Sequence, residues 1–119
     1  MAKRSRFSNG MVIANGRPTA TNPSGETVLL AVTRYTTTIN PASVAAATSA
    51  EQTFTVTGLL AGDIVLAINK PTATAGLGIV NARVSAADTL AITFMNATAG
   101  AVDAASESYE VIVGRFSTT

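Results

Sequence analysis

The sequence predicts an all-β protein, built as a sandwich or a barrel and preceded by an N-terminal arm. Short runs of β-branched or alternating residues recur along the chain, and turn signals separate them about every 8–12 residues. No segment carries a convincing amphipathic helix pattern. The 119 residues fit one domain with an appendage. We therefore expect an arm over residues 1–25 and one antiparallel β-domain over residues 26–119.

The first 25 residues are interpreted as an extended basic arm. Turn and chain-breaking pairs recur through them, and the only consecutive apolar residues are Met11, Val12 and Ile13. Before the first acid, Glu26, the chain carries +4, whereas residues 26–119 carry four basic and seven acidic side chains, or −3. Such a charge difference is typical of an interaction tail. The segment is either a disordered terminus or one that orders on a partner. Its basic residues are Lys3, Arg4, Arg6 and Arg17.

Six strands are expected after the arm. The run at 63–68 is almost continuously apolar, which is typical of a strand buried on both faces. Residues 41–52 contain three consecutive alanines, but Pro41, Thr48 and Ser49 disfavour a helix, so we expect a loop with at most one turn. The six predicted strands cover residues 27–39, 51–57, 63–68, 79–84, 90–95 and 109–114.

The residue types that most catalytic and metal sites need are missing. The chain has no His and no Cys, which removes imidazole bases, thiolate nucleophiles, disulfides and Cys-ligated metals. Among the seven carboxylates only Glu107 and Glu110 are close in sequence, and we expect both to face solvent beside the last strand. No Asp-rich loop suits calcium. We therefore expect no enzymatic activity, no cofactor and no metal.

Two further patterns favour structural interpretations. Gly76-Leu77-Gly78 lacks the third glycine of a dinucleotide-binding fingerprint, because position 81 is Asn, and we interpret it as a bend that leads into a strand. Carbohydrate-binding sandwiches usually expose aromatic platforms, whereas this chain has no Trp and places both tyrosines in strand patterns. We expect Tyr35 and Tyr109 in the core or in an interface.

Neither a membrane span nor an export signal is evident. The most apolar stretch, residues 58–68, is interrupted by Asp63, and the basic start is followed by polar residues rather than an apolar segment. We therefore expect synthesis in the cytoplasm and no membrane partner.

Residues 3–6 could touch phosphates through charge alone, but no nucleic-acid-binding motif accompanies them. For this basic segment, an acidic protein surface is favoured as the partner over nucleic acid.

The body of the chain is short of charge. Only 13% of the residues are charged, against about a quarter in an ordinary soluble domain. Thr-rich strands without edge charges would also invite edge pairing if left bare. Both observations indicate that part of the surface is covered by partners. The residues therefore predict a structural or interaction module, oligomeric or packed into a larger assembly.

Two groups of segments within residues 39–113 carry a resemblance to a known family. The first group is INPASV at 39–44, EQTFTVTGL at 51–59, GD at 62–63 and NKP at 69–71. The second group is GLGI at 76–79, ARVS at 82–85 and LAITF at 90–94. Together they resemble the small β-sandwich proteins of tailed bacteriophages that decorate or cement capsids.

The resemblance implies a single antiparallel β-sandwich, jelly-roll-like or immunoglobulin-like, that is often a homotrimer. It further implies a virion protein on the capsid exterior, synthesised in the host cytoplasm, whose partner is the lattice of the major capsid protein. The charge difference makes the arm the candidate for capsid contact. The candidate contact residues are Lys3, Arg4, Arg6, Phe7, Met11, Val12, Ile13 and Arg17.

An alternative is a phage fibre or tail module that recognises a host surface. Such a module needs an exposed and chemically specific patch. Residues 69–78 and 96–100 form the only evident loops for it.

Overall fold

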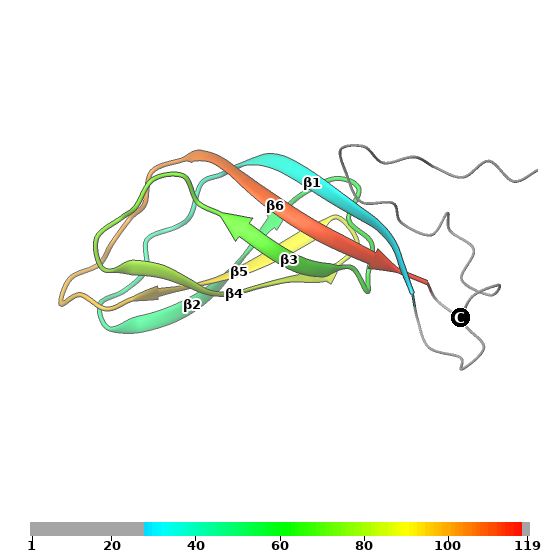
Figure 1. The fold of residues 1–119 in the computed structure, drawn as a ribbon. Coiled ribbons are helices and arrows are strands. Elements are labelled where there is room, and N and C mark those ends of the chain that lie inside the picture. Colours follow the sequence, from blue (N-terminus) through cyan, green and yellow to red (C-terminus); the bar gives the residue numbers. More distant parts are fainter. Residues whose placement is uncertain (1–27, 118–119) are drawn as a thin grey trace, which may run out of the picture.

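The computed structural model describes residues 28–117, which form six strands in two antiparallel sheets and contain no helix. The expectation of an all-β fold is confirmed. One sheet has the order β1-β6-β3 and the other the order β2-β5-β4, and the two face each other as in a sandwich (Figure 1). The strands are β1 (Leu29–Ile39), β2 (Thr48–Thr55), β3 (Ile64–Asn69), β4 (Leu77–Ala86), β5 (Thr89–Asn96) and β6 (Glu107–Phe116).

The predicted loop at 41–52 is shorter than expected. It ends at Ala47, which has a φ of 54°, and β2 then begins at Thr48. Residues 48–50 join the sheet because β5 extends far enough to pair with them, up to Thr48 opposite Asn96. Cross-strand pairing therefore overrides the weak local preference of this Ala-, Thr- and Ser-rich segment.

The core is built mainly from the two central strands. Alternate residues of a strand point to opposite faces, and one row of β5 and one row of β6 point into the space between the sheets. These side chains are at most 2% exposed and belong to one hydrophobic cluster. The two rows are Leu90, Ile92 and Phe94 on β5 and Tyr109, Val111 and Val113 on β6.

The prediction that the 63–68 run is buried on both faces is wrong. β3 is an edge strand that pairs only with β6, and Val65 and Ile68 turn toward the core. Ile64 and Leu66 are each 50% exposed on the opposite face. The continuous apolar run at 63–68 therefore belongs to an edge strand whose outer face has no cover among residues 28–117.

The two ends of the sandwich are built differently. At one end, which we call the arm end, Val28 and Ser117 exchange hydrogen bonds, and the 56–63 loop is bonded to the turn that carries Asp88. At the other, the loop end, three loops lie together, as the left side of Figure 1 shows. Those loops span residues 40–47, 70–76 and 97–106.

The core contains one buried polar atom without a partner among the described residues, the hydroxyl of Tyr109. Burial, with a smaller contribution from Glu107, raises the pKa of Tyr109 to about 12. The folded state therefore favours the protonated phenol. Its contribution to stability is complete below pH 10, the ordinary pKa, and is lost as the pH rises toward 12.

Tyr109→Phe is expected to raise the free energy of unfolding at pH 7 by about 1 kcal/mol, because it removes an unpaired buried hydroxyl. The variant should also lose less stability than the parent between pH 9 and about 11.5. Urea unfolding of parent and variant at pH 7, at pH 9 and at about pH 11.5 measures both effects. A loss of stability at pH 7 would show that the hydroxyl has a partner.

Candidate functional site

The predicted capsid-contact residues lie outside the described part of the chain. This holds for Lys3, Arg4, Arg6, Phe7, Met11, Val12, Ile13 and Arg17. The candidate site built here therefore consists of the surface next to Val28, where the described chain begins.

The outer face of the β1-β6-β3 sheet is apolar. Opposite the core row of β6, Gly114 lies between Val32 on β1 and Ile64 on β3. A Cβ atom at Gly114 would lie 3.2–3.4 Å from three side chains that converge over it. We call this surface the apolar face. It comprises Leu29, Val32, Ile64, Leu66 and Phe116 around Gly114.

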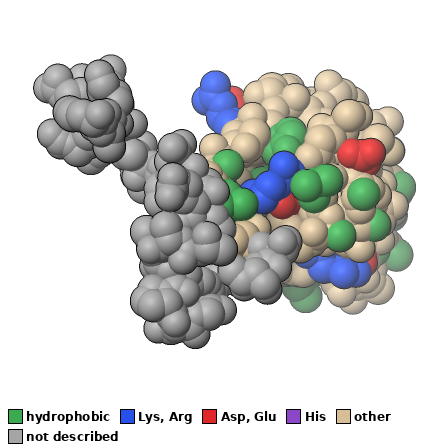
Figure 2. Space-filling view, turned by 90° about the vertical axis from the view of Figure 1, so that its right-hand side faces the viewer, with side chains coloured by type: hydrophobic (Ala, Val, Ile, Leu, Met, Phe, Trp, Pro, Cys, Tyr) green, Lys and Arg blue, Asp and Glu red, His purple; other side chains and the backbone are tan. Residues whose placement is uncertain are grey.

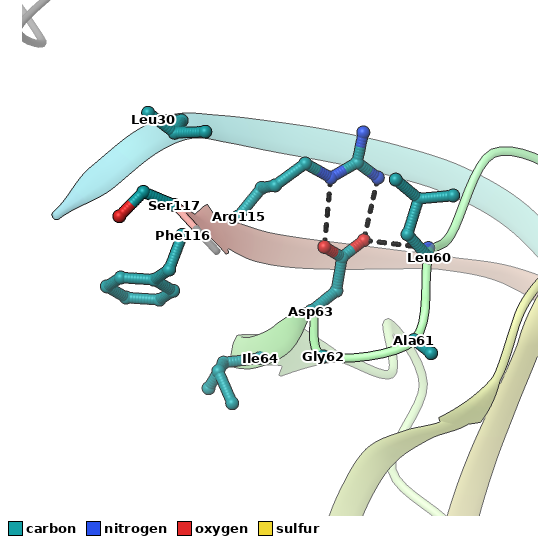
Figure 3. A pocket seen from close by; sticks show the side chains of 9 residues that line it. All are labelled: Leu30, Leu60, Ala61, Gly62, Asp63, Ile64, Arg115, Phe116 and Ser117. Atoms are coloured by element: carbon teal, nitrogen blue, oxygen red, sulfur yellow. Dashed lines mark hydrogen bonds and ion pairs between the residues drawn. The ribbon is translucent and has the colours of Figure 1, made fainter. Parts of the chain in front are cut away.

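A pocket of about 660 Å³ opens at the arm end and shares Ile64 and Phe116 with the apolar face. Figure 3 shows side chains from β1, the 60–63 loop, the start of β3 and the end of β6 around it. Seen from this end in Figure 2, green hydrophobic side chains surround a basic and an acidic group. The lining residues are Leu30, Leu60, Ala61, Gly62, Asp63, Ile64, Arg115, Phe116 and Ser117.

One wall of the pocket is a charged pair. Nε and one Nη of Arg115 donate to the carboxylate of Asp63 at 2.9 and 2.7 Å, and the same Nη donates to the Gly58 carbonyl at 2.9 Å. The carboxylate also accepts the Leu60 N–H at 3.0 Å. The Asp63 side chain is 2% exposed and that of Arg115 is 36% exposed. Together these bonds fasten the 58–63 loop to β6, and the dashed lines of Figure 3 show those between Arg115 and Asp63 and between Asp63 and Leu60.

Each member of the pair shifts the pKa of the other in the direction that favours its charged form. Hydrogen bonding by Arg115 is the main cause that lowers the pKa of Asp63, against the opposing effect of burial. The same bond raises the pKa of Arg115. Both groups therefore stay charged around neutral pH. An acid kept ionised in this way is poorly suited to donate a proton to a substrate.

Four of the carboxylates in the described residues form ion pairs. The expectation that both glutamates at the last strand face solvent is wrong for Glu107, which is 16% exposed and lies 3.0 Å from Lys70. Glu110 is 44% exposed and lies 3.3 Å from Arg34. Within residues 28–117 no group of three Asp or Glu side chains is placed to hold a metal ion. The four pairs are Arg34–Glu110, Lys70–Glu107, Arg83–Glu51 and Arg115–Asp63.

At the loop end a buried asparagine joins two of the three loops, 40–47 and 97–106. The Asn96 amide nitrogen donates to the carbonyls of Val44, Ala45 and Gly100, at 2.8–3.2 Å. Its oxygen accepts from the backbone N–H and the hydroxyl of Thr98. The two loops proposed for host recognition lie side by side through a separate backbone bond, in which the Ala97 N–H donates to the Gly76 carbonyl.

The glycine-rich bend and the tyrosines lie where the sequence predicts. Gly76 has a φ of +78° just before β4, and a Cβ there would overlap the side chain of Thr98. Tyr109 is fully buried, and Tyr35 is half-buried against the core. The predicted bend ahead of a strand is therefore found at Gly76, although Leu77 and Gly78 already belong to β4, and the predicted core position is found for Tyr109.

The pocket residues were not singled out from the sequence. Leu60 lies in a segment read as a turn, and Phe116 lies beyond the predicted end of the last strand. The pair Leu59-Leu60 is a signal in the sequence, because two large apolar residues stand side by side outside the predicted strands. In the structure Leu59 is buried, whereas Leu60 is 50% exposed at the pocket.

Comparison with family models, with curated proteins and with solved structures finds no significant match to this chain. Among residues 28–117 no helix is long and apolar enough to span a membrane.

Asp63→Asn is expected to lower the free energy of unfolding by about 2 kcal/mol, because a nearly buried charge-assisted pair is broken. Glu51→Gln is the matched control. It alters a two-bond Arg–carboxylate pair with Arg83 that crosses β5 on the exposed surface, where solvent screens the charges, and should cost much less stability. Urea unfolding at pH 7 compares the two variants. Equal losses of stability would contradict the prediction that the Asp63–Arg115 pair contributes more than the exposed Glu51–Arg83 pair.

The parent should lose the Asp63 contribution as the pH falls from about 4 through the lowered pKa of the folded state. Asp63→Asn has no such contribution to lose. The difference in stability between parent and variant should therefore shrink in acid. A constant difference down to about pH 2 would show that the ionised carboxylate is not what stabilises the loop.

Proposed function

We propose that the protein is a structural protein of the virion that decorates or cements the capsid of a tailed bacteriophage. In this proposal it binds the lattice of the major capsid protein from the outside, as a homotrimer, and it is not an enzyme. The observation that carries the proposal is the apolar face, which a lone soluble domain would not normally leave bare.

The apolar face suits a contact between copies of the chain. Leu66 and Ile64 are half-exposed on an edge strand, and Val32 is 38% exposed across the same sheet. Burying such side chains stabilises an assembly by roughly 25 cal/mol per Å². The Arg34–Glu110 ion pair lies farther along the same outer row and can form part of a polar rim.

The arm supplies the proposed contact with the capsid. Its four basic residues precede the first acid of the chain, so attraction to an acidic lattice surface and apolar contact through residues 11–13 can act together. A ligand that binds only the assembled shell stabilises that shell by mass action. Many copies acting in this way would reinforce the shell against internal pressure.

The strand order supports an immunoglobulin-like sandwich over a jelly roll as part of the proposal. In immunoglobulin domains the sheets run A-B-E-D and C-F-G. The order β2-β5-β4 corresponds to B-E-D, and β3-β6 corresponds to C-F. β1 then occupies the position of the last strand, G.

The alternative is a fibre or tail module that recognises a host surface. The feature that favours it is the loop end, where Asn96 fastens two loops to each other and a backbone bond from Ala97 to Gly76 attaches the third. Incubation with host-cell envelopes and with shells of the same virus discriminates between the two. A decoration protein should bind the shells and ignore the envelopes, and the opposite result would support the alternative.

Leu66→Asp is expected to convert a trimer into monomers, because it places a charge in the proposed contact between copies. Thr55→Asp, on the exposed side of β2 in the other sheet, should leave the trimer intact. Light scattering after size exclusion measures the mass, and circular dichroism checks that both variants fold. A parent protein with the mass of one subunit would remove the trimer from the proposal.

Deletion of residues 1–17 is expected to lower occupancy on shells at least about tenfold, which corresponds to about 1.4 kcal/mol of lost binding free energy. Replacement of the four basic arm residues by Gln should weaken binding and reduce its salt dependence. Co-sedimentation with shells at two salt concentrations measures both effects. Undiminished occupancy after the deletion would overturn the role of the arm.

A further inference from the structure

We propose that the pocket at the arm end holds Met11, Val12 and Ile13 of the same chain while the protein is free in solution. This inference does not depend on the proposed capsid function. It concerns the isolated protein and gives the pocket an occupant.

The chemistry of the pocket favours an apolar occupant. Leu30, Leu60, Ile64 and Phe116 contribute hydrocarbon surface, and Leu60 and Ile64 are each 50% exposed. The charged wall does not favour a charged ligand, because the Arg115 guanidinium already donates to Asp63 and to a carbonyl. A volume of about 660 Å³ lies within the range of pockets that hold small ligands, which suits a few apolar side chains.

The arm has the length to reach the pocket. Val28 is hydrogen-bonded to Ser117, which itself lines the pocket, so the described chain begins at the pocket rim. Fourteen residues, 14–27, separate Ile13 from Val28 and can span up to about 46 Å. They include Gly16, Pro18, Pro23 and Gly25, which suit a reversal of chain direction.

The same chain is a stronger candidate than a second copy. A segment tethered by a short flexible linker has an effective concentration in the millimolar range at a nearby site. A separate, unassociated chain at micromolar concentration is far more dilute than this, and within the proposed trimer an arm supplied by a neighbouring copy would be revealed by disulfides between chains. Residues 11–13 are also the only run of three large apolar side chains among the first 25, so they match an apolar pocket better than the rest of the arm does.

The absence of cysteine from the chain allows a direct test. Val12→Cys is combined with Leu60→Cys in the pocket, and in a control with Ala87→Cys, which is exposed on a turn at the same end. The full-length proteins are oxidised with diamide at micromolar concentration, without capsids, and resolved on denaturing gels. We expect the pocket pair to form an intrachain disulfide at least about tenfold faster than the control pair.

A third variant separates docking from mere proximity. Adding Ile13→Asp to the pocket pair keeps the tether but places a charge on the docking segment, and should slow closure to the rate of the control pair. Equal rates for pocket and control pairs, or no effect of Ile13→Asp, would overturn the proposal. Disulfides between chains rather than within one would also overturn it, by assigning the pocket to a second copy.

Circular dichroism and urea unfolding of the reduced variants check that Leu60→Cys folds. If it does not, Ile64→Cys at the opposite side of the pocket replaces it, with the same control. Because no capsid is present, failure here leaves the capsid proposal untouched. Loss of shell binding with normal closure would leave this inference untouched.

Discussion

The fold depends on the packing of β5 against β6. Each sheet has only three strands, so its central strand is the only one flanked on both sides by backbone partners. The six core side chains of these two strands are almost completely buried, whereas the other four strands contribute many half-buried residues. The outer strands therefore have to find additional cover elsewhere. On β3 that cover is missing within the described residues, and the apolar face results.

The sequence predicted the strands well and their surroundings less well. Alternation at Tyr109, Val111 and Val113 locates a strand and its buried side, because period-two patterns report burial on one face. The run at 63–68 carries no such alternation, so sequence could not say whether the second face meets protein or solvent. Pairing with a distant strand decided where β2 begins. The pocket depends on the approach of three distant segments, which no local pattern contains.

Two groups of polar side chains hold the chain together where it changes direction. Asp63 and Arg115 fasten the loop before β3, and Asn96 joins two loops at the opposite end. One device uses opposite charges and the other a neutral amide, so acid acts mainly on the first. Of the four ion pairs, Arg115–Asp63 and Lys70–Glu107 lie where strands begin or end, whereas Arg34–Glu110 and Arg83–Glu51 lie on the faces of the two sheets.

The adjacency of Val28 and Ser117 has a mechanical consequence. β1 begins where β6 ends, and the hydrogen bonds between antiparallel strands run across the strand direction. A pull on the arm against the end of β6 therefore peels the ladder one rung at a time, starting from Val28, instead of loading all rungs together. For the proposed role on a shell, the load would therefore have to pass through the broad face of the body. The arm can locate and orient that body, but an edge whose hydrogen bonds break one at a time cannot carry much load.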